Sequence, residues 1–165
     1  MLAFRRSGAP VRLAMAVGIL SGAAAMSAAA EGPFSALSGT WSGSGQMRFA
    51  GGNAEALKCR AFYTPKDTGA SMGLAIRCAS PSNKIELRAT LTSNAGRVTG
   101  VWEERTFNAT GDVTGQASST RINLSIKGGG FTGSMMVGTT GSTQSVLIQT
   151  EGMGLSSVNI NLSKI

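Results

Sequence analysis

The feature that most constrains this chain is a strict alternation of apolar and polar residues that recurs along most of its length. Apolar residues occupy every second position in several segments: Leu57, Cys59, Ala61 and Tyr63; Met72, Leu74, Ile76 and Cys78; Ile85, Leu87, Ala89 and Leu91. A period of two residues is typical of a β-strand with one face in a core and the other in water. The alternation therefore predicts antiparallel strands.

Ten such segments are predicted, and short turns join nearly all of them. They span 41–50, 56–64, 71–79, 83–92, 96–105, 111–117, 119–127, 131–138, 143–150 and 155–163. The 23 glycines among 165 residues supply turn formers. Outside the N-terminal 30 residues no segment has helical periodicity, although 31–37 can form one turn. We expect an all-β, antiparallel up-and-down meander of about 8–10 strands, closed as a barrel or packed as a two-layer sandwich.

The N-terminus has the three regions of a secretory signal peptide. Three arginines precede an apolar run from Leu13 to Ala25, and small residues end at Ala30 before Glu31. The run is too short to span a bilayer, which takes roughly 20 helical residues. We predict a leader that is cleaved after Ala30, with an uncleaved anchor as the alternative, and a single β-barrel-like domain over residues 31–165. The expected location is periplasmic or secreted.

The charge of the remaining chain is modest. The leader removes three of the 15 basic residues and none of the eight acidic ones, which leaves a net charge of +4. The basic residues are scattered, and no aromatic stacking platform lies among them, so nucleic-acid binding is not expected. Attraction to an anionic membrane or envelope surface remains open.

The two cysteines, Cys59 and Cys78, fall on neighbouring predicted strands. A hairpin centred on Thr68 and Gly69 places Cys59 opposite Cys78, Ala61 opposite Ile76 and Tyr63 opposite Leu74, all on one face. In an oxidising compartment this geometry predicts one disulfide. A metal site is not expected, because the chain has no histidine and only two thiols.

The first predicted strand opens with Gly39, Thr40 and Trp41. Here the chain resembles the calycin superfamily of lipocalin-like and avidin-like barrels, in which a Gly-x-Trp motif opens the first strand. That resemblance implies that Gly39 and Trp41 form a structural plug at one barrel end. The strand pattern also places Trp41 on the same face as Gly43 and Gly45, pointing into the core. More broadly, the chain resembles exported proteins of Gram-negative bacteria, which implies a compartment and no chemistry.

A membrane-spanning barrel is the rival fold, because its strands also alternate. Such a barrel needs an apolar outer band. The outward positions here are instead charged in three neighbouring strands: Lys58, Arg60, Arg77, Lys84, Glu86 and Arg88. This face favours water, so we expect a protein that does not span the membrane.

Catalytic groups are scarce. The chain has no histidine, both thiols are expected to be bonded, and the adjacent Glu103 and Glu104 point to opposite faces of a strand. We therefore expect no enzymatic activity and no cofactor.

A binding site is the remaining hypothesis. Pairing Leu91 with Val98 across a turn at 93–96 places Ala89 opposite Gly100 and Leu87 opposite Trp102, which leaves volume beside the indole. The candidate ligand-lining residues are Trp102, Leu87, Ala89, Gly100, Ile76 and Tyr63. They predict either a carrier of a small apolar molecule, with a cavity of a few hundred Å³, or a structural or interaction protein of the cell envelope whose interior is filled, by Met135 for instance. Any envelope partner is unknown.

Overall fold

The computed structural model describes residues 30–106, 108–152 and 154–165. The predicted leader, apart from Ala30, lies outside the described residues. The chain forms ten strands: β1 (Gly39–Phe49), β2 (Ala54–Lys66), β3 (Ser71–Ala79), β4 (Lys84–Asn94), β5 (Arg97–Glu104), β6 (Ala109–Ala117), β7 (Arg121–Gly128), β8 (Phe131–Thr140), β9 (Thr143–Glu151) and β10 (Leu155–Lys164). Two short 3₁₀ turns accompany them, η1 (Ser35–Leu37) and η2 (Asp67–Gly69).

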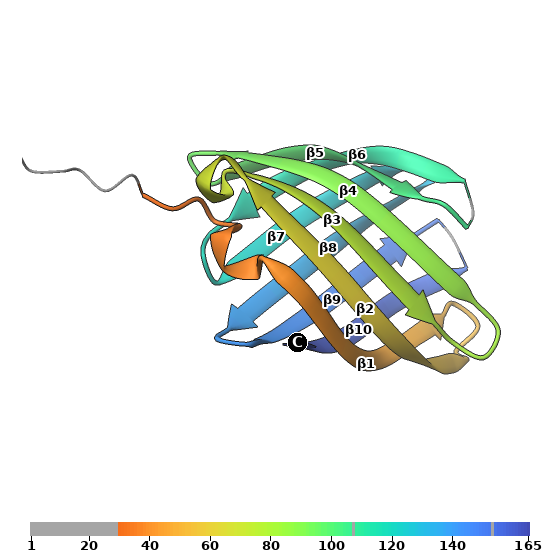
Figure 1. Cartoon of the computed structure of the whole chain (residues 1–165). Coiled ribbons are helices and arrows are strands. Elements are labelled where there is room, and N and C mark those ends of the chain that lie inside the picture. The colour runs from red at the N-terminus through yellow and green to blue at the C-terminus, as the bar shows by residue number, and fades with distance from the viewer. Residues whose placement is uncertain (1–29, 107, 153) are drawn as a thin grey trace, which may run out of the picture.

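The strands close into one antiparallel barrel (Figure 1). Each strand pairs with its neighbour in sequence, and β1 pairs with β10 to complete the ring. The predicted all-β meander of ten strands is confirmed, and of the two predicted packings the closed barrel is correct. Closure leaves no free sheet edge in the ring, which removes a common route to aggregation.

The apolar residues of the alternating pattern point into the barrel, and the polar residues point out to solvent. In β2, for example, Leu57, Cys59 and Ala61 are buried, whereas Lys58 and Arg60 between them are exposed. Trp41, Met72, Val98, Val137 and Ile160 extend the same buried core around the ring. Among the described residues, no helix is long and apolar enough to cross a membrane.

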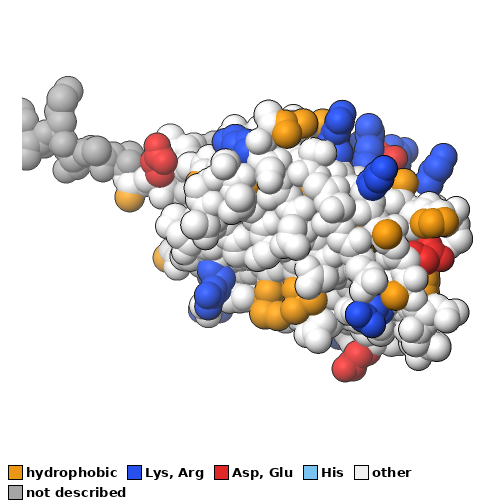
Figure 2. Space-filling model, turned by 90° about the horizontal axis from the view of Figure 1, so that it is seen from below, with side chains coloured by type: hydrophobic (Ala, Val, Ile, Leu, Met, Phe, Trp, Pro, Cys, Tyr) orange, Lys and Arg blue, Asp and Glu red, His pale blue; other side chains and the backbone are white. Residues whose placement is uncertain are grey.

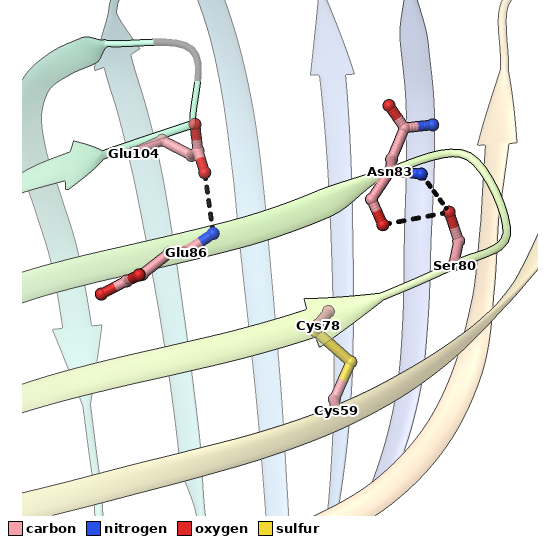
Figure 3. Close-up of a disulfide and its surroundings, with 6 residues drawn as sticks. All are labelled: Cys59, Cys78, Ser80, Asn83, Glu86 and Glu104. Atoms are coloured by element: carbon pink, nitrogen blue, oxygen red, sulfur yellow. Dashed lines mark hydrogen bonds between the residues drawn. A yellow bond between two sulfur atoms is a disulfide. The ribbon is translucent and has the colours of Figure 1, made fainter.

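The hairpin between β2 and β3 has the predicted register. Cys59 pairs with Cys78, Ala61 with Ile76 and Tyr63 with Leu74. The Cα atoms of the two cysteines lie 4.1 Å apart, and a disulfide joins them across the strands (Figure 3). The predicted disulfide is therefore confirmed.

The register predicted between β4 and β5 is wrong by two residues. Asn94 pairs with Arg97, because Ala95 and Gly96 form a two-residue turn with φ angles of 50° and 82°. Two consecutive positive φ values are typical of the tightest hairpins, and alanine rarely adopts one. Ala89 therefore lies opposite Trp102, Leu87 opposite Glu104 and Leu91 opposite Gly100. A shift of two residues keeps each side chain on its predicted face.

Candidate functional site

The two ends of the barrel differ in how they are filled. We call the end that carries η1 and the β2–β3 turn the plugged end. There the Trp41 side chain is fully buried, and its Nε1 donates a hydrogen bond of 2.8 Å to the carbonyl oxygen of Leu37. Phe34 is also fully buried, and the Tyr63 ring meets Trp41 edge-on with centroids 6.3 Å apart. The aromatic side chains and η1 together close this end.

The segment before η1 is hydrogen-bonded to the β2–β3 turn. The backbone N–H of Gly32 donates to Thr68 O at 2.9 Å, and that of Phe34 donates to Gly69 O at 3.1 Å. Gly69 has φ +88°, and a Cβ there would overlap Ser35. Glycine is needed at this position both for the conformation and for the close approach. Backbone hydrogen bonds between the segment before η1 and the β2–β3 turn thus hold the plug in place.

Tyr63 belongs to the plugged end. Its hydroxyl donates a 2.7 Å hydrogen bond to Gln144 Oε1, and both side chains are buried. Burial raises the pKa of the Tyr63 hydroxyl above its ordinary value, and the bond to Gln144 offsets part of that rise. The structure therefore separates Tyr63 from the other candidate ligand-lining residues.

Lys164, on β10, also contributes to the plugged end. Its Nζ lies 5.8 Å from the centroid of the Trp41 ring, within the range of a cation–π contact. Trp41 and Lys164 are paired in the β1–β10 register. Sequence reasoning missed this contact because it depends on barrel closure between strands far apart in the chain.

At the opposite end, which we call the open end, no such plug is present among the described residues. The inward side chains near this rim are only half-buried although they are apolar: Ile85, Leu87, Ala109, Phe131, Ile148 and Leu155. We call this partly accessible apolar rim the mouth of the barrel.

An apolar cavity of about 150 Å³ lies inside the barrel toward the open end. Four of the candidate ligand-lining residues, Trp102, Leu87, Ala89 and Ile76, line it. Met135 and Val146 from the far side also contribute to the wall. Gly100 is not among the lining residues, and a Cβ at that position would overlap the backbone of Thr90. The cavity is smaller than the few hundred Å³ expected for a carrier.

Trp102 is the aromatic wall of this cavity. Its side chain is 5% exposed, and its ring lies 5.3 Å from that of Phe131, centroid to centroid. The indole packs over Gly111, where a Cβ would lie 2.7 Å from Nε1. The Nε1 atom is buried and has no hydrogen-bond partner within the described part of the chain. Such an unsatisfied buried donor costs free energy.

Glu104 is the charged side chain of the cavity wall. Glu103 is exposed on the outer face, whereas Glu104 points inward and lines the cavity. One Glu104 oxygen, Oε1, accepts a 2.8 Å hydrogen bond from the backbone N–H of Glu86 (Figure 3). The alternation of β5 already assigns Glu104 to the inner face, but its place at the mouth follows only from the observed β4–β5 register. No cluster of metal-ligating side chains is found among the described residues.

Comparison with known proteins supports the fold alone. The sequence matches no protein-family model and no curated protein. In structure the chain is similar to Rv2717c from M. tuberculosis, with a TM-score of 0.64 and 15% identity over 79% of this chain and 93% of that one. It is also similar to the S-type phycobiliprotein lyase CpeS from Guillardia theta, with a TM-score of 0.53 and 13% identity over 80% of this chain and 90% of that one. Both neighbours are ten-stranded antiparallel barrels of the calycin-like kind.

Proposed function

We propose that this protein is an exported, non-catalytic member of the calycin group that binds a small, neutral, apolar molecule inside its barrel. The observation that carries the proposal is the apolar cavity below the open end. Binding sites for small molecules are typically concave, largely preformed and lined by apolar and aromatic side chains with few polar groups. The cavity has this composition, and the half-buried rim leaves it a mouth.

The size of the cavity limits the ligand. Pockets for drug-sized ligands occupy about 300–1,000 Å³, and this cavity holds about 150 Å³. An apolar cavity of roughly that size stays dry and accepts a molecule such as benzene. The proposed ligand is therefore about as large as one aromatic ring or a short alkyl chain.

Glu104 sets the charge of the ligand. A carboxylate in the cavity wall repels a second carboxylate brought into the same low-dielectric space. Short-chain fatty acids should therefore bind less well than neutral alcohols or hydrocarbons of equal length. Hexanol and hexanoate form a matched pair of probes, and Glu104→Gln should narrow the difference between them. Glu103→Gln, on the outer face, should leave the difference unchanged.

The proposed location is the periplasm or the extracellular medium. A disulfide-bonded barrel fits a protein outside the cytoplasm, and the leader-like N-terminus supports export. Intact-mass analysis of the exported protein tests this, since a mass that retains residues 1–30 would contradict cleavage after Ala30. The absence of histidine and the bonded state of both cysteines support a binding role over an enzymatic one.

The decisive experiment measures binding of benzene by titration calorimetry and by the shift in the unfolding midpoint. A ligand that binds only the folded state raises the midpoint with concentration. Ala89→Phe fills the cavity from β4 and should abolish the effect. Thr90→Phe, one residue along and exposed, is the matched control and should retain it. Equal binding by both variants would exclude the cavity as the site.

The alternative function is a structural or interaction protein of the envelope that carries no ligand. Mass spectrometry under non-denaturing conditions, on protein purified from its own source, distinguishes the two. A retained small molecule supports the carrier. Recovery of the bare polypeptide, together with absence of benzene binding, supports the alternative.

A further inference from the structure

A second feature lies on the outside of the barrel, on the face formed by β2, β3 and β4. Four cationic side chains, Lys58, Arg60, Arg77 and Lys84, project outward there and are exposed. We call them the basic face. Figure 2 shows Lys and Arg side chains gathered toward the upper right of the molecule in that view. The strand pairings bring the four together: Arg60 lies opposite Arg77, and Ala79 lies between Lys58 and Lys84.

The charge on the basic face is poorly compensated. The ion pairs found among the described residues join Glu86 to Arg77 at 3.6 Å and Glu86 to Arg88 at 2.8 Å. Lys58, Arg60 and Lys84 therefore have no acidic partner in the described part of the chain. Like charges directly opposite in a sheet, as at Arg60 and Arg77, are destabilising. The Glu86–Arg77 ion pair offsets part of that cost.

The surface between the cations is a shallow hollow. Its lining includes the four cations, the small residues Ser42, Ser44 and Ala79, and the carboxylate of Glu86. The side chains stand on the convex outer wall and do not enclose a small anion. This shape fits an extended array of negative groups better than one free phosphate.

We propose that the basic face docks on the phosphate groups of an anionic lipid surface. The aromatic side chain beside Arg60 on the outer face of β2 is the half-buried Phe62, a single ring, whereas single-stranded nucleic acids stack successive bases on several aromatic groups. Several basic side chains on one rigid face suffice for attraction to anionic lipid headgroups, and each contributes independently of any apolar insertion. Lys84 and Ala79 border the β3–β4 turn at the open end, so docking holds the mouth of the barrel close to the lipid.

The test is co-sedimentation with vesicles of phosphatidylcholine containing phosphatidylglycerol, and with vesicles of phosphatidylcholine alone. We expect binding to the anionic vesicles only, weakened by added salt. The double variant Arg60→Gln/Arg77→Gln should bind about 30-fold more weakly, roughly fivefold for each charge removed. Arg97→Gln/Arg121→Gln removes two exposed arginines at the plugged end and is the matched control, expected to lose less than about twofold.

Three outcomes would overturn the proposal. Equal loss in both double variants would mean that only net charge matters. Binding that is insensitive to salt would rule out a phosphate-directed surface. Binding to soluble inorganic polyphosphate without binding to the anionic vesicles would assign the basic face to a soluble polyanion. Vesicle binding is expected to be independent of the cavity. The Ala89→Phe variant should therefore bind vesicles as the unmodified protein does.

Discussion

The two tryptophans, one at each end of the barrel, show how the same residue type serves two different purposes. Trp41 is fully buried and its N–H is paired with Leu37, whereas Trp102 is 5% exposed and its N–H has no partner among the described residues. Trp41 is surrounded by side chains and by η1, while Trp102 faces a cavity. The plugged end therefore contributes stability, and the open end retains space at some cost in stability.

The largest effect is expected from Trp41→Ala. Gly43 and Gly45 follow Trp41 on the same face and have no side chains to fill the space that the indole leaves. The change should lower the free energy of unfolding by about 3–5 kcal/mol, as for other large-to-small core substitutions. Urea unfolding with the disulfide intact measures this. Trp102→Ala should cost about 1 kcal/mol less, because its indole borders a space that is already empty. A loss below about 1 kcal/mol at Trp41 would contradict its role as a plug.

Removal of the disulfide should rank second. Cys78 lines the cavity, so the bond to Cys59 braces the wall around the unfilled space. The chain-entropy model gives about 3 kcal/mol for a loop of this length. The double variant Cys59→Ala/Cys78→Ala and the reduced wild-type protein should both show that loss in urea unfolding. If reduction left the unfolding midpoint unchanged, the open half would not depend on the covalent link.

Replacement of each tryptophan by phenylalanine isolates the two N–H groups. Trp41→Phe removes a buried hydrogen bond and leaves the Leu37 carbonyl without its indole donor, which should cost about 1–3 kcal/mol. Trp102→Phe removes a donor that is already unpaired and should cost less. Thermal unfolding of the two variants side by side gives the comparison. Equal losses would indicate that Trp102 Nε1 is hydrogen-bonded in solution.

The smallest effect concerns alkaline pH at the plugged end. Because the pKa of Tyr63 is raised in the folded state, its contribution to stability is complete below the ordinary tyrosine pKa of about 10 and is lost as the pH rises further. Tyr63 is the single tyrosine of the chain, so tyrosinate absorbance reports on it alone. We expect ionisation to accompany unfolding. Titration near pH 10 in a folded barrel would show that the plugged end admits solvent.

The strands were predictable because the alternation of apolar and polar residues within each segment is enough to indicate a strand. A period of two residues needs no knowledge of distant partners, so the ten strands and their inward faces follow from the pattern. The Cys59–Cys78 register was also predictable, since turn formers mark the hairpin centre. The β4–β5 register was not, because it depends on Ala95 adopting a positive φ that its side chain disfavours.

The candidate site was less predictable than the fold. The position of the cavity depends on which half of the barrel is filled by side chains. One half is filled because η1 folds over Trp41, and hydrogen bonds from the segment before η1 to the β2–β3 turn hold it there. No local pattern in residues 30–38 specifies that contact. Tyr63 and Ile76 both occupy inward positions by the alternation of their strands. The alternation does not tell which half of the barrel each lies in, and Tyr63 lies in the filled half and not beside the cavity.

The pairing of β1 with β10 also sets an order on folding. Every other pairing joins strands that are neighbours in sequence and can form as soon as both have been synthesised. The β1–β10 pairing cannot form before β10 is present. Until then β1 and β9 present unpaired backbone groups to solvent and to other chains. Closing it carries the largest loop entropy of any step in the ring. The folding chain is therefore most exposed to edge-to-edge association just before β10 pairs with β1. Conditions that slow the pairing of β10 should increase aggregation without changing the stability of the closed barrel.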